Sequence, residues 1–111
     1  MIGVDVTGIN RFEKISENDY SSWEKVFTES EWKYCFKGVN SAMHLAGIFA
    51  SKEAVMKAVG NDIMKRYDLI EVIHNDEGKP EIVLKIEKTH KIEVSISHDA
   101  GVAVAVAMVA K

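Results

Sequence analysis

Three short segments of this 111-residue chain carry side chains that could do chemistry. The first holds Asp5, the second holds Lys52-Glu53 with Lys57, and the third is Ser95-Ile96-Ser97-His98. Carboxylates, amines, hydroxyls and an imidazole are the groups that bind polar ligands or move protons in active sites.

Each segment also has a simpler structural interpretation. Asp5, between two valines, could be the outward carboxylate of a half-exposed strand. Glu53 and Lys57 stand four residues apart in the order that favours an exposed ion pair on a helix, worth about 0.2–0.5 kcal/mol. The segment 95–98 could be the solvated side of a strand and the turn after it. Taken singly, none of the three requires a function.

Two segments of the chain have patterns that predict helices. The Thr28 hydroxyl and Glu31 carboxylate can satisfy free backbone amides reciprocally as a capping box, with Phe27 and Trp32 placed to close a hydrophobic staple, so a helix begins there. Apolar residues at helical spacing predict a second helix over 42–59, ended by Gly60. Lys52, Glu53 and Lys57 are expected on or beside its polar face.

The remaining patterns have period two and predict strands. The strands are expected at 2–6, 69–73, 81–86, 91–97 and 102–109, with a turn at 75–80. In the first strand, Asp5 is expected to face away from the valines beside it. The last strand alternates large with small residues and has no polar face, so both of its sides should be covered.

These elements predict one α+β domain over 1–111, with helices packed on a largely antiparallel sheet. A formal charge of −3, from 14 Lys+Arg against 17 Asp+Glu, argues against nucleic acid as a partner. The single Cys35 excludes an internal disulfide and is expected to be a small buried group. No basic region precedes an apolar N-terminus, and the longest apolar run, 101–110, is shorter than the roughly 20 residues that span a bilayer. We expect a cytoplasmic protein without a membrane segment.

Together the segments resemble one family, the holo-acyl-carrier-protein synthases, which are short, single-domain 4′-phosphopantetheinyl transferases. The resemblance covers nearly the whole chain in register. It rests on these motifs in order: Gly3-Val4-Asp5-Val6; Phe27, Thr28 and Glu31; Leu45 to Ala54, containing Lys52-Glu53; Lys57-Ala58-Val59-Gly60; Gly78-Lys79-Pro80; and Val94-Ser95-Ile96-Ser97-His98.

The resemblance implies Mg²⁺-dependent transfer of the phosphopantetheine arm of coenzyme A to a serine of an apo acyl carrier protein, releasing adenosine 3′,5′-bisphosphate. Asp5 and Glu53 match the two metal-binding carboxylates, and Mg²⁺ takes one or two protein carboxylates together with phosphate oxygens and water. With Lys57 they form the implied catalytic set. The implied coenzyme-binding residues are Lys52, Lys57, Gly60, Gly78, Lys79, Ser95, Ser97 and His98. Either Glu53 or a metal-bound water could take the serine proton.

Two further expectations concern partners. Acyl carrier proteins are acidic, so their docking surface on the enzyme should be locally basic. Arg11 matches a family position on the first helix that meets the carrier, and Lys14 lies one turn along if that helix continues. The resemblance also implies a homotrimer with active sites shared between neighbouring subunits.

The sequence departs from the family pattern at three places. Gly8 replaces the usual Glu, Ile48 replaces the usual Arg, and Asn61-Asp62 replaces the usual Thr-Gly after Gly60. These changes remove groups that would contact phosphates or the ion and leave the metal-binding acids in place. The alternative functions are therefore a weakly active or inactive member of the fold that binds carrier protein as an assembly subunit, and a small α+β protein unrelated to this chemistry.

Overall fold

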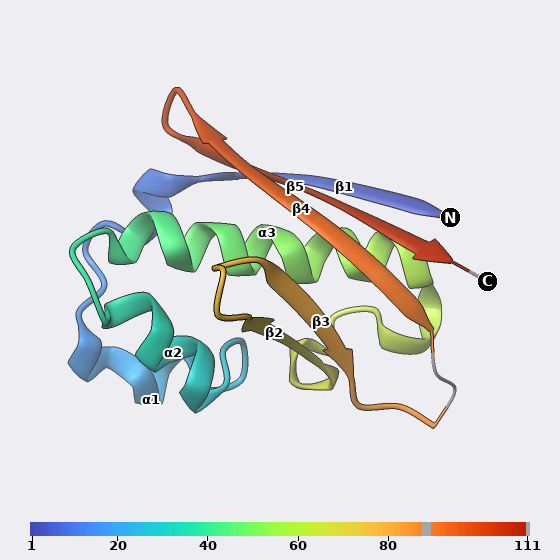
Figure 1. Ribbon diagram of the computed structural model, residues 1–111. Coiled ribbons are helices and arrows are strands. Elements are labelled where there is room, and N and C mark those ends of the chain that lie inside the picture. The colour runs from blue at the N-terminus through green and yellow to red at the C-terminus, as the bar shows by residue number, and fades with distance from the viewer. Residues whose placement is uncertain (88–89, 111) are drawn as a thin grey trace.

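A 19-residue helix, α3 (Ser41–Val59), forms the centre of the molecule, and the other elements pack against it (Figure 1). The computed structural model describes residues 1–87 and 90–110. A three-stranded sheet lies along one side of α3, and short helices with a two-stranded sheet lie along the other. Gly60 ends the helix with a φ of 102°, as predicted.

The three-stranded sheet has the order β1-β5-β4 and is antiparallel throughout. It consists of β1 (Ile2–Gly8), β4 (Lys91–Asp99) and β5 (Val102–Ala110). A two-residue turn of Ala100 and Gly101, with φ of 50° and 79°, joins β4 to β5. Two successive positive φ values match the twist of a tight hairpin, which explains the long continuous pairing of these strands.

The second sheet pairs β2 (Ile70–His74) with β3 (Pro80–Leu84). The Asn75 side chain closes the turn between them by accepting hydrogen bonds from the amides of Glu77 and Lys79, both at 2.9 Å. The prediction of largely antiparallel strands is thus confirmed, but the described strands form two sheets and not one. β3 and β4, consecutive in the chain, belong to different sheets.

The helical layer contains α1 (Tyr20–Trp23) and α2 (Glu29–Phe36), with four short 3-10 helices in the connecting segments. These are η1 (Ile9–Phe12), η2 (Glu17–Asp19), η3 (Asn61–Ile63) and η4 (Tyr67–Leu69). The predicted capping box of α2 is present, with both Thr28–Glu31 hydrogen bonds made. Phe27 and Trp32 pack with ring centroids 5.8 Å apart, as a staple requires.

The sheet lies close to α3 because the facing positions of its strands are small. Ala103, Ala105 and Ala107 of β5 are fully buried against the helix. On β1, the ideal Cβ of a residue larger than Gly3 would meet the Ala54 carbonyl oxygen and lie 2.8 Å from the Ala58 amide nitrogen. Glycine at this position is therefore what allows β1 to contact the helix backbone.

The other side of the same sheet is open, which corrects the expectation that both sides of β5 are covered. Its apolar side chains form what we call the outer sheet face. The exposed members are Ile2 (69%), Val4 (52%), Val6 (61%), Val106 (41%) and Met108 (45%). The strand register pairs Ile2 with Met108 and Val4 with Val106, so these side chains form adjoining cross-strand pairs. Asp5 faces away from the neighbouring valines, as predicted. The valines are on the exposed face of the strand, and Asp5 is on the opposite face.

Among the residues that the structure describes, no helix is both long and apolar enough to cross a membrane.

Replacing Gly3 with alanine should destabilise the protein by about 3 kcal/mol, because the new methyl group forces β1 away from the α3 backbone. Gly38→Ala is the matched control, since a Cβ at position 38 would meet nothing within 4 Å. Chemical denaturation of both variants measures the difference. Equal stability of the two would contradict the close approach of β1 and α3.

Candidate active site

Asp5 lies on the face of β1 that packs toward α3, with its side chain 15% exposed. The Thr7 hydroxyl donates to Asp5 Oδ2 at 2.8 Å, and Lys57 Nζ donates to Asp5 Oδ1 at 3.2 Å. Lys57 also donates to the Val4 carbonyl at 3.0 Å, although its side chain remains 53% exposed. A cation from α3 thus contacts a carboxylate from the first strand, with part of each group open to solvent.

Glu53 lies one turn before Lys57 on α3 and is half-buried. It accepts a hydrogen bond from the Tyr67 hydroxyl at 3.3 Å, and Tyr67 comes from η4. Burial raises the pKa of the Tyr67 phenol, the charges of Glu53 and Asp5 raise it further, and Arg11 opposes them. Both the Tyr67 ring and the Arg11 guanidinium pack on Phe49, and Lys57 joins Asp5 to the same part of α3. Asp5, Arg11, Glu53 and Tyr67 therefore share one neighbourhood, which we call the acidic cluster.

The exposed Glu53–Lys57 ion pair that the spacing allows is not formed. The described residues contain four ion pairs within 4.0 Å, and in them Lys57 contacts Asp5. The simpler interpretation of this segment is thereby wrong: Lys57 contacts Asp5, and Glu53 contacts the Tyr67 hydroxyl.

The acidic cluster offers a metal ion two carboxylates from two elements. The described residues contain no group of three or more His, Cys, Asp or Glu side chains able to hold a metal by themselves. A pair of oxygen ligands fits Mg²⁺, which keeps several waters and completes its coordination with substrate phosphate oxygens. The donor set is unsuited to zinc sites of the closed type, which need four protein ligands.

Lys52 does not lie on the polar face of α3 as expected; it is fully buried. Its Nζ contacts Glu31 Oε1 at 2.7 Å and donates to the carbonyls of Val26 at 2.7 Å and Tyr67 at 3.4 Å. Burial lowers the pKa of the Lys52 ammonium, and the Glu31 carboxylate opposes that shift. With all its donors engaged inside the protein, Lys52 has none left for a coenzyme phosphate.

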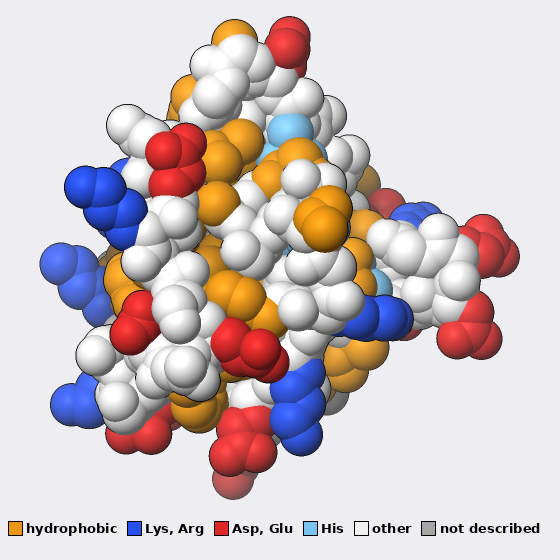
Figure 2. Space-filling model, turned by 90° about the vertical axis from the view of Figure 1, so that its left-hand side faces the viewer, with side chains coloured by type: hydrophobic (Ala, Val, Ile, Leu, Met, Phe, Trp, Pro, Cys, Tyr) orange, Lys and Arg blue, Asp and Glu red, His pale blue; other side chains and the backbone are white. Residues whose placement is uncertain are grey.

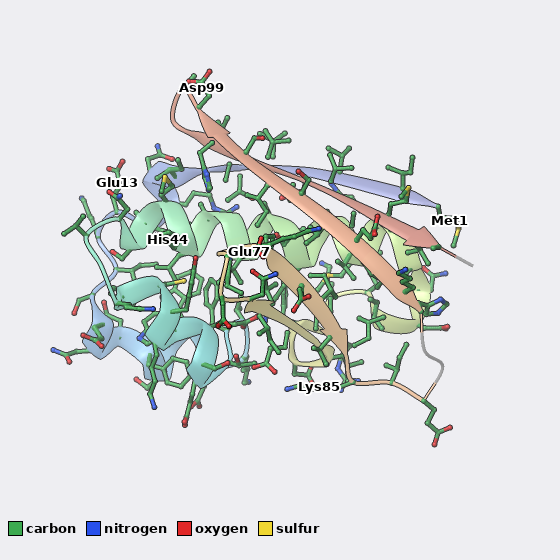
Figure 3. The ribbon with its side chains drawn as sticks, viewed as in Figure 1. Met1, Glu13, His44, Glu77, Lys85 and Asp99 are labelled. Carbon is green, nitrogen blue, oxygen red and sulfur yellow. The ribbon has the colours of Figure 1, made fainter. Side chains whose placement is uncertain are left out.

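A second group of predicted residues meets elsewhere, around a cavity of about 300 Å³ that we call the histidine cavity. Gly78 and Lys79 come from the β2–β3 turn, and Ser95 and His98 come from β4. His44, Gly47, Tyr34 and His74 complete its polar and small lining. Figure 2 shows histidine side chains recessed between apolar ones at this end of the molecule, and Figure 3 places His44 near the start of α3.

Three predicted site residues, Ser97, Gly60 and Lys14, lie apart from both groups. Ser97 is exposed on β4 and pairs with Val104, which places it with the outer sheet face. Gly60 ends α3 and does not line the histidine cavity. Arg11 belongs to η1, its guanidinium carbon 5.0 Å from the Phe49 ring centroid, but η1 ends at Phe12, so the helix does not continue to Lys14.

Sequence reasoning missed four contributors to these sites: Tyr34, His44, His74 and Tyr67. A signal existed for His44, because residues 44, 47 and 48 are spaced to share one face of a helix whose glycine admits close packing. Tyr67 carried no such signal, since its contact with Glu53 depends on how the segment after α3 folds back.

The acidic cluster and the histidine cavity occupy different parts of α3. His44 and Glu53 are nine residues apart, which is about 13 Å along the axis and about two and a half turns, so they lie on opposite faces of the helix. A single elongated ligand therefore cannot reach both by following one face of one subunit.

The comparisons with known proteins agree on one family. A family model described as the 4′-phosphopantetheinyl transferase superfamily matches residues 1–107. Similar curated proteins include the holo-[acyl-carrier-protein] synthase of Caldanaerobacter subterraneus subsp. tengcongensis, 40% identical over 96% of this chain and 91% of the relative. That of Chlorobaculum parvum is 39% identical over 97% and 96%.

Solved structures give the same result. The Helicobacter pylori holo-[acyl-carrier-protein] synthase in complex with coenzyme A matches with a TM-score of 0.84 and 34% identity, over 99% of this chain and all of that one. The Bacillus anthracis holo-(acyl-carrier-protein) synthase in complex with CoA (3′,5′-ADP) matches with a TM-score of 0.77 and 36% identity, over 97% and 93%. The chain belongs to the holo-[acyl-carrier-protein] synthase family of the 4′-phosphopantetheinyl transferases.

Replacing Lys52 with methionine should cost about 3–5 kcal/mol of stability, because the Glu31 carboxylate is left buried without its cation. The double variant Lys52→Met with Glu31→Gln should recover part of that loss, since the glutamine oxygen can still accept from a backbone amide. Denaturation and coenzyme A titration of the three proteins separate the roles. If the Lys52→Met variant keeps its stability but loses coenzyme A binding, Lys52 would instead belong to the coenzyme site.

Proposed function

We propose that this chain transfers 4′-phosphopantetheine from coenzyme A to a serine hydroxyl of an apo acyl carrier protein at the acidic cluster, within a single transferase domain over 1–111. The serine oxygen forms a bond to the phosphorus that carries the pantetheine arm, and the bond to adenosine 3′,5′-bisphosphate breaks. The observation that carries the proposal is the pair of carboxylates, Asp5 and Glu53, held beside Lys57 on two packed elements. The phosphorylated substrates and the buried Cys35 thiol fit a cytoplasmic site of action.

Asp5 and Glu53 would hold the Mg²⁺ ion, which when bound offsets the negative charge of the pyrophosphate and of the leaving bisphosphate. Lys57 remains half exposed while it contacts Asp5, so its ammonium can also approach phosphate oxygens. The Thr7 hydroxyl holds Asp5 from the other side and fixes its orientation. These groups supply the positioning and charge compensation on which phosphoryl transfer depends.

The histidine cavity would receive the nucleotide end of coenzyme A. Lys79 and His98 offer an ammonium and an imidazole, both suitable donors to phosphate oxygens, and Gly78 leaves room beside them. The Ser95 hydroxyl has less support as a donor, because Ser95 pairs with Val106 on the outer face of the sheet. The predicted roles of Ser97 and Gly60 have less support, because neither lines this cavity.

Two features taken together support a shared active site. The acidic cluster and the histidine cavity lie on opposite faces of α3, and the outer sheet face exposes adjoining apolar side chains. Exposed apolar patches of this kind mark association surfaces. We infer a homotrimer in which the acidic cluster of one subunit meets the histidine cavity of its neighbour.

The carrier protein would dock near Arg11. This residue is exposed, its charge acts on the Tyr67 phenol of the acidic cluster, and its guanidinium rests over Phe49. A cation at the edge of the reaction site suits an acidic partner. Lys14 is also exposed and would add to the same attraction from outside η1.

Asp5→Ala and Glu53→Ala should each lower Mg²⁺-dependent labelling of an apo carrier protein by about a hundredfold or more, because the ion loses a ligand. Glu24→Ala, an exposed acid outside the cluster, is the control. The readout is the mass added to the carrier serine. Full activity in both variants would overturn the site. Carrier binding without transfer at saturating coenzyme A would favour the inactive assembly subunit, and absence of coenzyme binding would favour a member of the family that has lost the reaction.

The wild-type protein should have a solution mass of about 37 kDa, three times the chain mass of 12.4 kDa. Val106→Asp places a charge on the outer sheet face and should yield a single-chain species with transfer activity lowered about a hundredfold. Val39→Asp, at a 96% exposed position away from the sheet, should keep both mass and activity. Light scattering and the transfer assay measure both; a fully active wild-type monomer would contradict the shared site.

A further inference from the structure

Three of the four histidines of the chain line one cavity and come from three different elements. His44 lies in the first turn of α3, His74 ends β2, and His98 is near the end of β4. His44 and His74 are half-buried, and His98 is exposed at the rim. Segments distant in the sequence thus bring together three imidazole rings.

Packing fixes the imidazole rings. The Tyr34 ring stacks on His74 at 3.8 Å with an interplanar angle of 4°, and it meets His44 edge to face at 5.3 Å. His98 packs against α3 at Gly47, where the ideal Cβ of any larger residue would lie 3.1 Å from the His98 Nε2. The cavity is therefore built around these rings.

The charge of the cavity depends on those rings. The titratable groups that line it are Tyr34 from α2, His44 from α3, His74 from β2, Lys79 from the turn and His98 from β4. None of the described lining residues is a carboxylate. Asp99 follows His98, but its carboxylate accepts a hydrogen bond from the Ala100 amide at 2.8 Å. Protonation of His44 and His74 would thus add two positive charges to that of Lys79.

The rings also oppose one another's protonation. Burial lowers the pKa of His44 and of His74; the charge of His98 lowers the pKa of His44 further, and that of His44 lowers the pKa of His74. A bound anion would reverse this effect, because it attracts each added charge. Anion binding and proton uptake at this cavity are therefore coupled, and each favours the other.

We propose that His44, His74 and His98 form a proton-dependent anion site that binds a phosphate monoester. Within the proposed function, on which this inference rests, that group is the 3′-phosphate of coenzyme A. A monoester carries about −1.5 to −2 charges near neutral pH, and it suits several N–H donors converging with one ammonium. Coenzyme affinity should rise as pH falls toward 6.5, below which the phosphate begins to lose its second charge.

The free protein should show the opposite trend. Because His44 and His74 have lowered pKa values in the folded state, the unfolded chain binds more protons near their ordinary value of about 6.5. Stability of the free protein should then fall as pH drops through that region, whereas stabilisation by coenzyme A should grow. As pH falls through this region, the stability of the free protein should decrease while the stabilisation by coenzyme A increases. These opposite trends distinguish proton-coupled binding from a general effect of acid.

The test is calorimetric titration of the wild-type protein with coenzyme A and with dephospho-coenzyme A, which lacks the 3′-phosphate, at pH 8 and pH 6.5 with Mg²⁺ present. Coenzyme A should bind about tenfold more tightly at pH 6.5, with net proton uptake shown by the dependence of the binding enthalpy on buffer. Dephospho-coenzyme A should change by about twofold or less. An equal pH dependence for both ligands, or no proton uptake, would overturn the assignment.

Two further measurements complete the test. The double variant His44→Gln with His74→Gln should flatten the pH dependence of coenzyme A affinity, and His90→Gln, which lies outside the cavity lining, should retain it. If the double variant fails to fold, NMR titration of the wild-type histidines decides: coenzyme A should raise the pKa of His44 and His74, and unchanged values would refute the proposal. Absence of coenzyme binding at both pH values would instead refute the proposed function.

Discussion

The buried ion pair between Lys52 and Glu31 joins the helical layer to α3 and to the second sheet. Glu31 accepts from the amides of Thr28 and Val72, both at 2.7 Å, while Lys52 reaches the carbonyls of Val26 and Tyr67. Two charges removed from water are costly unless every donor and acceptor is satisfied. Here they are, so the start of α2, the middle of α3 and the first strand of the second sheet hold fixed relative positions.

The same ion pair bears on the reaction site. Lys52 contacts the Tyr67 carbonyl, and the Tyr67 hydroxyl donates to Glu53, the next residue along α3 from Lys52. Adjacent helix residues point about 100° apart, so the lysine is directed into the core and the glutamate toward the Tyr67 hydroxyl. One short segment thus anchors the core with one side chain and carries with the other a carboxylate that we propose as a metal ligand.

Local signals predicted the elements well. The capping box of α2, the stop at Gly60 and the strand alternation all depend on neighbouring residues, and each is present near its expected bounds. Signals that depend on tertiary packing were less informative. The lysine in Lys52-Glu53 looks like a polar-face residue until Glu31, 21 positions earlier, is seen to be buried with it. In the same way β5 has no polar face, yet the sequence does not say whether its valines meet this chain or another.

The association that we propose through the outer sheet face would make the stability of the protein depend on its own concentration. Apolar side chains on β1 and β5 gain burial only from a neighbour, so association adds free energy to the folded state by mass action. A 111-residue chain has limited burial of its own. In the trimer that we propose, dilution would weaken the fold and separate the two parts of each shared active site at the same time, so specific activity would depend on cellular abundance.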